Sequence, residues 1–248
     1  MIAKWIISHF PPHSTYVEPF GGGASVLFAK DPVGVEVYND INHRVYHFFQ
    51  TLRTHGDEFI KLATLTPYHS TEFSASRFGA STPVRRALND FILWRQSFGA
   101  QGKVWSSSKR SRRGMAGNVS AWLSAVDGLP EVVERLRRVE FHCEDAMDLL
   151  ERLEPKASRG TVWYCDPPYL HETRTTKDVY ENEMSEDDHV RLAEILQTTN
   201  AQVCLSGYPS ALYDRLYAGW RKASKTVANH AAGGRSKRRM TETLWMNY

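Results

Sequence analysis

The chain has 248 residues, of which 42% are hydrophobic and 24% charged, and its formal net charge is +3. This composition supports a folded core and excludes a disordered chain, and no apolar run approaches the ~18 residues of a membrane-spanning helix. The three cysteines, Cys143, Cys165 and Cys204, form no Cys-x-x-Cys pair, which argues against a disulfide framework and a zinc site. We therefore expect a soluble, cytoplasmic globular protein that makes no membrane contact.

The first 53 residues alternate between strand and helix patterns. Residues 15–20 (TYVEPF) predict a short buried strand, which a glycine turn at 21–23 and a helix over 24–30 follow. A second strand is predicted at 33–38 and ends at Asn39-Asp40, and residues 43–53 have the apolar spacing of an amphipathic helix. This order is typical of the start of a doubly wound α/β domain.

Residues 54–138 break this alternation. Helices are predicted over 83–97, 118–125 and 130–138, with an irregular loop rich in Gly, Ser and Arg between the first two. Alternation then resumes, with strands predicted at 139–142, 161–165 and 202–206 and helices at 146–153, 185–199 and 210–218. A final hairpin returns along residues 240–248. We predict a doubly wound, Rossmann-like α/β domain formed by residues 1–53 and 139–248, with a mostly helical domain inserted at 54–138.

The charge is concentrated in the inserted segment. Residues 54–138 carry 13 basic and 7 acidic residues, a net charge of +6, so the rest of the chain carries −3. No carboxylate lies between Asp90 and Asp127, and this window holds aromatic residues and the candidate DNA-binding residues Arg95, Lys103, Lys109, Arg110, Arg112 and Arg113. Basic side chains with interleaved aromatic rings suit a polyanion, although a solvated loop would have the same composition.

A second basic cluster lies near the C-terminus. It contains Arg235, Lys237, Arg238 and Arg239, follows Gly233-Gly234, and is predicted to form the tip of the final hairpin. Hairpin tips are often basic for solubility alone, so this cluster is compatible both with DNA binding and with a simple surface role.

The first motif with chemical meaning is Glu18-Pro19-Phe20-Gly21-Gly22-Gly23, at a turn from strand to helix. Glycines let the backbone approach a ligand closely, and a carboxylate about 20 residues later, here Asp40, can accept hydrogen bonds from ribose hydroxyls. The glycine spacing is not G-x-G-x-x-G, which disfavours a dinucleotide oxidoreductase. A nucleoside without phosphates, such as S-adenosylmethionine, fits this motif better.

The second motif is Asp166-Pro167-Pro168-Tyr169, directly after the predicted strand 161–165. The carboxyl end of a strand is where open α/β sheets bind ligands, and two prolines make the chain leave the strand stiffly. The Asp166 carboxylate and the Pro167 carbonyl could then accept both hydrogens of an NH2 group, while the Tyr169 ring offers a stacking face. A simple edge turn is the alternative, and we favour the functional interpretation.

Together these motifs resemble the Dam-like (D12 class, group alpha) DNA adenine-N6 methyltransferases, and the resemblance is greatest to phage-encoded members. It extends over residues 17–28 (VEPFGGGASVLF), 38–42 (YNDIN), 144–145, 165–169 (CDPPY), 205–208 (LSGY) and 242–248 (ETLWMNY). The 142 residues between Gly23 and Asp166 match the arrangement in which a target-recognition domain is inserted.

The resemblance implies methyl transfer from S-adenosylmethionine to the N6 atom of an adenine that is flipped out of double-stranded DNA. It implies that Asp166, Pro167, Pro168 and Tyr169 are catalytic, and that no metal is needed. It implies that the cofactor is bound by Glu18, Phe20, Gly21, Gly22, Gly23, Asp40, Asp145, Ala146 and Asp166. Arg174 lies in the polar segment 171–183, which we expect to order over the target base.

The resemblance is incomplete at the start of the chain. Family members usually begin with a segment that contains Lys, Trp and a G-x-K sequence and helps to hold the cofactor, whereas here Met1 falls at or just after it. A catalytically impaired DNA-binding relative therefore stays an alternative, as does an N4-cytosine or RNA amino-methyltransferase. We expect a monomer acting in a bacterial or phage-infected cell, in a phage or restriction-modification context.

Overall fold

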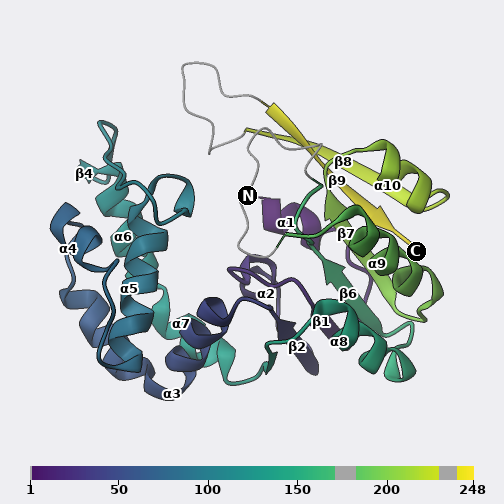
Figure 1. Ribbon diagram of the computed structural model, residues 1–248, viewed down its shortest axis with the longest axis horizontal. Coiled ribbons are helices and arrows are strands. Elements are labelled where there is room, and N and C mark those ends of the chain that lie inside the picture. The colour runs from purple at the N-terminus through teal and green to yellow at the C-terminus, as the bar shows by residue number, and fades with distance from the viewer. Residues whose placement is uncertain (1, 171–182, 229–238) are drawn as a thin grey trace. The chain divides into compact units, whose positions relative to one another are not determined.

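The computed structural model describes residues 2–170, 183–228 and 239–248, with the side chains of 227, 228 and 239 left aside. The chain divides into two compact units. The sheet unit comprises Met1–Tyr46 and Val139–Tyr248, and the helical unit comprises His47–Arg138 (Figure 1). The first boundary lies after residue 46, earlier than the predicted one after residue 53, because Phe48 packs against Phe59 and Phe91 of the helical unit. The helix expected at 43–53 continues as α3 (His43–Leu65), with non-helical backbone at His55.

The sheet unit is built on one sheet with the strand order β5-β2-β1-β6-β7-β9-β8. The first five strands in this order pair in parallel, whereas β9 pairs antiparallel with both β7 and β8. The strands are β1 (Thr15–Glu18), β2 (Val35–Asn39), β5 (Glu140–His142), β6 (Thr161–Cys165), β7 (Gln202–Gly207), β8 (Arg221–Ala228) and β9 (Arg239–Met246). The predicted α/β class with a mostly parallel sheet is confirmed.

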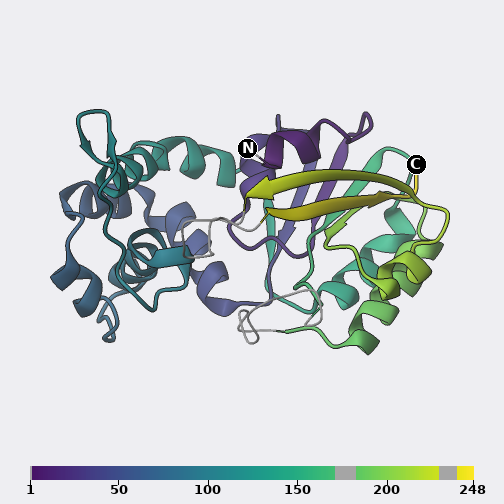
Figure 2. The same cartoon turned by 90° about the horizontal axis from the view of Figure 1, so that it is seen from above.

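Helices cover both faces of this sheet (Figure 2). The helices of the sheet unit are α1 (Ile2–Ile7), α2 (Ser25–Ala29), α8 (Ala146–Leu153), α9 (Glu186–Thr198) and α10 (Ala211–Leu216), with a short 3-10 turn at Glu154–Lys156. Leu150, Leu192 and Tyr213 from α8, α9 and α10 pack with Trp163 of β6 in one buried apolar cluster. On the opposite face α1 packs against α2, and Figure 2 shows α1 on the other side of the β8–β9 hairpin from the green helices.

The helical unit has its own aromatic core. Its helices are α3 after residue 46, α4 (Ser70–Ala75), α5 (Pro83–Gln96), α6 (Gly117–Asp127) and α7 (Leu129–Leu136), with a 3-10 turn at Phe98–Ala100. The rings of Phe48 and Phe91 stack with centroids 5.8 Å apart, and the rings of Phe91 and Trp122 lie 5.2 Å apart. The Trp122 indole donates a 3.0 Å hydrogen bond to the Thr66 carbonyl, so its polar group is satisfied inside the core.

Two features of the helical unit differ from the prediction. Helix α4 was not expected, and the segment expected to be an irregular loop contains a small hairpin formed by β3 (Ser111–Arg112) and β4 (Met115–Ala116). Its turn is Arg113-Gly114, with φ of 54° and 74°, which is the backbone of a type I′ hairpin turn. The usual Asn-Gly or Asp-Gly signal is absent, and for that reason the composition alone suggested a loop.

Among the residues that the structure places, no helix has the length and apolar character needed to cross a membrane.

Candidate functional site

The predicted site residues follow four neighbouring strands of the sheet. The glycine turn follows β1, Asp40 follows β2, Asp145 follows β5 and Asp166 follows β6. These strands pair in parallel in the order β5-β2-β1-β6, so their carboxyl ends meet at one edge. The structure therefore brings the two sequence motifs to the edge where open α/β sheets bind their ligands.

The glycine turn is held against strand β2. The Gly22 amide donates a 2.7 Å hydrogen bond to Asp40 Oδ2, and the Tyr38 hydroxyl donates one of 2.6 Å to the Gly22 carbonyl. A Cβ on Gly21 would lie 2.0 Å from the Tyr38 ring, and Gly22 has a φ of +49°. The first two glycines are therefore required by close approach and by backbone conformation respectively.

Asp40 is oriented by backbone amides. Its Oδ2 accepts from Gly22, and its Oδ1 accepts a 2.8 Å hydrogen bond from the Asn42 amide. Burial raises the pKa of the Asp40 carboxyl, and these two hydrogen bonds oppose that effect. A carboxylate held in this way is a suitable acceptor for ribose hydroxyls, as its position in the sequence suggested.

Asn39 joins the loops of three strands, and the sequence analysis did not assign it a role. Its Nδ2 donates to the Pro19 carbonyl at 2.9 Å and to the Glu144 carbonyl at 3.1 Å, while its Oδ1 accepts from the Glu144 amide at 3.0 Å. The glycine-turn loop and the Glu144-Asp145 loop are thus both fixed to the end of β2. Its position directly before Asp40 at the end of a buried strand was the available signal.

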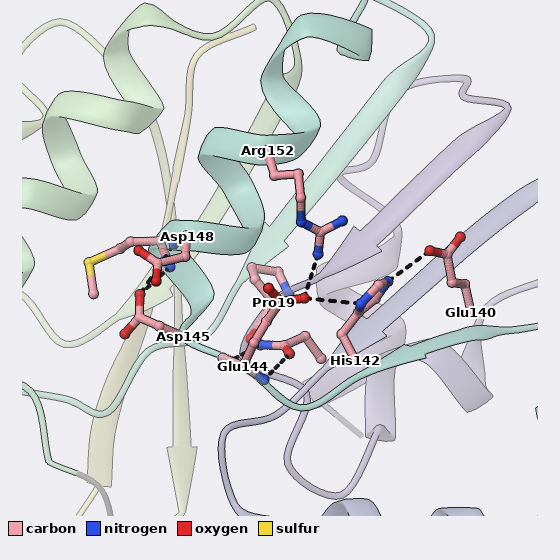
Figure 3. A network of polar contacts seen from close by, with 9 residues as sticks. Pro19, Glu140, His142, Glu144, Asp145, Asp148 and Arg152 are labelled. Carbon is pink, nitrogen blue, oxygen red and sulfur yellow. Dashed lines mark hydrogen bonds and ion pairs between the residues drawn. The ribbon is translucent and has the colours of Figure 1, made fainter.

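Asp145 is placed by the start of α8 and by a polar network beside it (Figure 3). Its Oδ1 accepts from the Met147 amide at 2.9 Å and the Asp148 amide at 3.2 Å, which makes it the N-cap of α8. Next to it, Glu144 pairs with Arg152 and with the His142 ring. The predicted adenine-binding pair, Asp145 and the buried Ala146, therefore lies on a loop with fixed geometry.

Glu18 lies inside the sheet unit and bonds to the chain itself. Its Oε2 accepts from the Tyr16 hydroxyl at 2.7 Å and from the Leu27 amide at 3.1 Å, so it ties β1 to α2. Burial, helped by the charge of nearby Asp166, raises the pKa of Glu18 to about 8. Phe20, two residues later, is partly buried against the apolar cluster around Trp163.

Asp166 is the central polar group at the end of β6. Its Oδ1 accepts a 2.7 Å hydrogen bond from the Ser206 hydroxyl of β7, and that hydroxyl lies 3.2 Å from the Tyr164 hydroxyl. Burial raises the pKa of Asp166, and its hydrogen bonds oppose the shift. Pro167 is buried and Pro168 partly buried, which fits a stiff exit from the strand.

Tyr169 is held at both ends. Its hydroxyl donates a 2.9 Å hydrogen bond to Glu242 Oε1 of β9, and its ring lies 4.4 Å from the Tyr208 ring at an angle of 57°. Sequence analysis did not single out Ser206, Tyr208 or Glu242 as site residues. Glu242 lies in the predicted returning strand 240–248, just before the apolar run 244–246, and a glutamate in that setting was a usable signal for the last of them.

The residues at this edge fit S-adenosylmethionine. A Cβ on Gly22 or Gly23 would meet no atom within 4 Å, so the backbone of the turn has open space beside it. The acids that follow the neighbouring strands β2, β5 and β6, namely Asp40, Asp145 and Asp166, suit ribose hydroxyls and a cationic sulfonium and would repel a pyrophosphate. Among the described residues, no group of three or more His, Cys, Asp or Glu side chains could hold a metal ion.

The predicted basic residues of the helical unit are exposed. This holds for Arg95, Lys103, Lys109, Arg110, Arg112 and Arg113, and the last four lie on or beside the β3–β4 hairpin. The base of the hairpin is fixed by Tyr68 and Asn118, which both donate hydrogen bonds to the Ser106 carbonyl. Arg174, Arg235, Lys237 and Arg238 lie outside the described residues, whereas the two strands of the C-terminal hairpin are present as predicted.

A family model described as D12 class N6 adenine-specific DNA methyltransferase matches residues 1–227. The chain belongs to this family. It is similar to the DNA adenine methylase of Vibrio cholerae, with 26% identity over 91% of this chain and 85% of the relative. The DNA adenine methylase of Serratia marcescens is 26% identical over 92% and 88% of the two chains, and that of Escherichia coli K12 is 24% identical over 76% and 69%.

Two solved structures were also found to be similar over 99% of this chain, each at 13% identity. One is an rRNA methyltransferase, aviRa from Streptomyces viridochromogenes, with a TM-score of 0.43 and 82% of that chain covered. The other is a SAM-dependent methyltransferase from Agrobacterium tumefaciens, with a TM-score of 0.41 and 59% covered. The family match confirms the prediction of an S-adenosylmethionine-dependent enzyme that methylates adenine in DNA at N6.

The contact of Gly21 with Tyr38 gives a first prediction. Gly21→Ala should lower the free energy of unfolding by about 1–3 kcal/mol, because the added methyl group overlaps the buried Tyr38 ring. Urea unfolding followed by circular dichroism measures this change. Gly23→Ala, where the methyl group meets no atom within 4 Å, is the matched control and should change stability by less than about 0.5 kcal/mol. Equal stability of the two variants would contradict the packing argument.

The buried Glu18 gives a second prediction. Its pKa of about 8 in the folded protein exceeds the ordinary value of 4.5, so the folded state binds more protons than the unfolded state between these pH values. The free energy of unfolding should therefore fall as pH rises across this window, by up to about 1.4 kcal/mol per pH unit for this group. Glu18→Gln, which keeps both hydrogen bonds but cannot ionise, should flatten the dependence.

Urea midpoints measured from about pH 5 to about pH 8 test this. Glu194→Gln, at an exposed carboxyl of α9, is the control and should keep the slope of the wild type. An unchanged slope in Glu18→Gln would show that Glu18 is already ionised at low pH.

Proposed function

We propose that this methyltransferase acts on an adenine flipped out of double-stranded DNA, with Asp166 and Pro167 as acceptors for its amino group. The observation that carries the proposal is the position of Asp166, which lies at the carboxyl end of β6 and is fixed by the Ser206 hydroxyl. An amino group that is paired inside a duplex cannot reach a partly buried carboxyl, so the base has to leave the stack.

S-adenosylmethionine supplies the methyl group as its S–CH3 bond breaks and an N6–CH3 bond forms, with the S–CH3 electron pair staying on sulfur. Asp166 and the Pro167 carbonyl each accept one N6 hydrogen and so direct the nitrogen lone pair away from themselves. The nitrogen becomes positive as it is alkylated, and the Asp166 carboxylate favours that charge. Its raised pKa also suits Asp166 to take up the proton that N6 then releases.

Cofactor binding is assigned to the other residues of the edge. Asp40 would accept from the ribose, Asp145 and Ala146 would contact the adenine ring, and Phe20 to Gly23 would line the methionine part. Support comes from the fixed positions of these groups, since Asp40 is held by the Gly22 amide and Asp145 by the start of α8. Glu18 would act from behind the turn, by tying β1 to α2.

DNA binding is assigned mainly to the helical unit. Its exposed cations near the β3–β4 hairpin displace counterions from phosphates, which gives affinity without sequence preference. The hairpin is narrow enough to enter a major groove, where a two-stranded ribbon can read base edges. The division of charge, +6 on residues 54–138 against −3 on the rest, supports this assignment.

Asp166→Ala is the test of the catalytic assignment. It should lower methyl transfer about a hundredfold or more, because an acceptor aimed at the reacting nitrogen is lost. The assay uses labelled S-adenosylmethionine and unmethylated plasmid DNA, with digestion to nucleosides, and binding to duplex DNA is measured by fluorescence anisotropy. Asp187→Ala, an exposed carboxylate on α9, is the control and should keep full activity. Label recovered in N4-methylcytosine, or full activity of Asp166→Ala, would overturn the proposal.

Lys109→Ala combined with Arg110→Ala tests the DNA-binding assignment. Each phosphate contact that is lost should make the slope of log K against log salt less steep by about 0.9. Anisotropy titrations at several salt concentrations give this slope. Lys156→Ala with Arg159→Ala removes the same charge just before β6, at the opposite edge of the sheet, and should leave the slope as in the wild type. Equal slopes for the two double variants would show that the hairpin base does not contact phosphates.

A further inference from the structure

A row of buried and partly buried polar groups crosses four adjacent strands on one face of the sheet. It consists of Glu18 at the end of β1, Asp166 after β6, Ser206 in β7 and Glu242 in β9, and the sheet order places these strands side by side. Glu242 lies inside β9 and is only 7% exposed, an environment in which a carboxyl is costly unless it has a partner.

The partner of Glu242 is the tyrosine of the Asp-Pro-Pro-Tyr motif. Its Oε1 accepts a 2.9 Å hydrogen bond from the Tyr169 hydroxyl. The residue opposite Glu242 in the β8–β9 register is Lys225, and its ammonium lies over the Trp5 ring, 5.7 Å from the centroid. The Glu242 carboxyl is thus directed toward Tyr169 of the Asp-Pro-Pro-Tyr motif.

The Tyr169 ring is defined by two contacts of different kinds. The bond to Glu242 fixes the hydroxyl end, and the contact with the Tyr208 ring, 4.4 Å between centroids, supports the side of the ring. A tyrosine side chain has only two main torsions, so fixing the hydroxyl leaves the ring plane little freedom. A planar stacking partner is useful only when its face is held in the correct orientation.

We propose that Glu242 is a positioning residue for methyl transfer: it holds the Tyr169 hydroxyl and thereby orients the ring face on which the target adenine stacks. This inference rests on the proposed function, in which Tyr169 stacks on the flipped base. Glu242 does not touch the reacting atoms itself. Its effect reaches the reaction through one hydrogen bond, and that bond can be removed from either end.

The environment of Glu242 supports a role as an acceptor rather than as a fixed charge. Burial and the nearby Asp166 raise the pKa of Glu242 to about 7, and the bond from Tyr169 opposes the shift. Both the carboxylate and the carbonyl oxygen of the protonated acid accept from a hydroxyl. A glutamine, whose carbonyl oxygen also accepts, should therefore replace Glu242 in this role.

The experiment compares Glu242→Ala, Glu242→Gln, Tyr169→Phe and the double variant Glu242→Ala with Tyr169→Phe. Initial rates with labelled S-adenosylmethionine and unmethylated plasmid DNA give kcat and the KM for DNA. Glu242→Ala and Tyr169→Phe should each lower kcat about tenfold, the double variant should lose no more than either alone, and Glu242→Gln should stay within about threefold of the wild type. The KM for DNA should change less than kcat, because DNA binding is assigned to the helical unit.

Thr243→Ala is the matched control. Thr243 is the next residue on β9, is also buried, and has its own hydrogen bond, 2.9 Å from the Ser224 hydroxyl, but it points to the other face of the sheet. It should keep the kcat of the wild type even if it unfolds at a lower temperature. A loss of kcat equal to that of Glu242→Ala would reduce Glu242 to a general structural role and overturn the proposal.

Two further outcomes would contradict the proposed role of the Glu242–Tyr169 hydrogen bond. Losses that multiply in the double variant, or full kcat in Tyr169→Phe, would show that the hydrogen bond does not carry the effect. Where Glu242→Ala does not fold, Tyr169→Phe tests the bond from the tyrosine end, and full kcat in that variant would overturn the proposal. A wild-type protein that gives no N6-methyladenine would instead overturn the proposed function, and this inference with it.

Discussion

The parallel pairing of β1 with β6 is the constraint on which the site depends. These strands are separated in the sequence by the whole helical unit, yet Thr15 pairs with Thr161 and Val17 with Trp163. The pairing places the glycine turn after β1 beside Asp166 after β6, so the groups assigned to the cofactor and to the target base share one edge. Without this pairing, the glycine turn and the Asp-Pro-Pro-Tyr motif would not lie at the same edge of the sheet.

The two faces of the sheet have opposite effects on the stability of the fold. On the face covered by α8, α9 and α10, residues such as Trp163, Val203 and Leu205 are fully buried in an apolar cluster. On the other face lie the carboxyls of Glu18 and Glu242, and burial disfavours their charged forms, as their raised pKa values indicate. Apolar burial on one face therefore offsets the cost of buried acids on the other, and the acids persist because hydrogen bonds satisfy them.

Sequence reasoning located most of the sheet unit because its signals are local. Each strand next to the site is a short apolar run that ends at a turn, and the Asp-Pro-Pro-Tyr motif follows directly from residues 161–165. It missed features that depend on partners far along the chain. Asn39 acts through carbonyls at Pro19 and Glu144, and Glu242 acts through Tyr169, so the local sequence marks each as an unusual polar residue but does not show its partner.

In the helical unit, too, local sequence patterns did not predict features that depend on distant residues. The β3–β4 hairpin has Arg113 where a type I′ turn usually has Asn or Asp, and its base is fixed by Tyr68, which lies far earlier in the sequence. Composition indicated the basic character of this segment but not its strands. The helix predicted over 43–53 agrees with the first part of α3, which is interrupted at His55. The second part was not predicted, and it packs within the helical unit, where Gly56 lies against Val133 of α7.

The charges of the two units constrain which part of a DNA substrate can approach the acidic edge of the sheet. The edge of the sheet carries the acids Asp40, Asp145 and Asp166, which would repel a phosphate backbone that came as close as a hydrogen bond. A single uncharged base is not repelled in this way, and its amino group matches the acceptors there. In the proposed function the backbone is held by cations elsewhere in the chain, and the window between Asp90 and Asp127, which has no carboxylate, offers them. The base flipping of the proposed function is then favoured by electrostatics as well as by access to N6, because only the base can approach an acidic site while its phosphates stay outside.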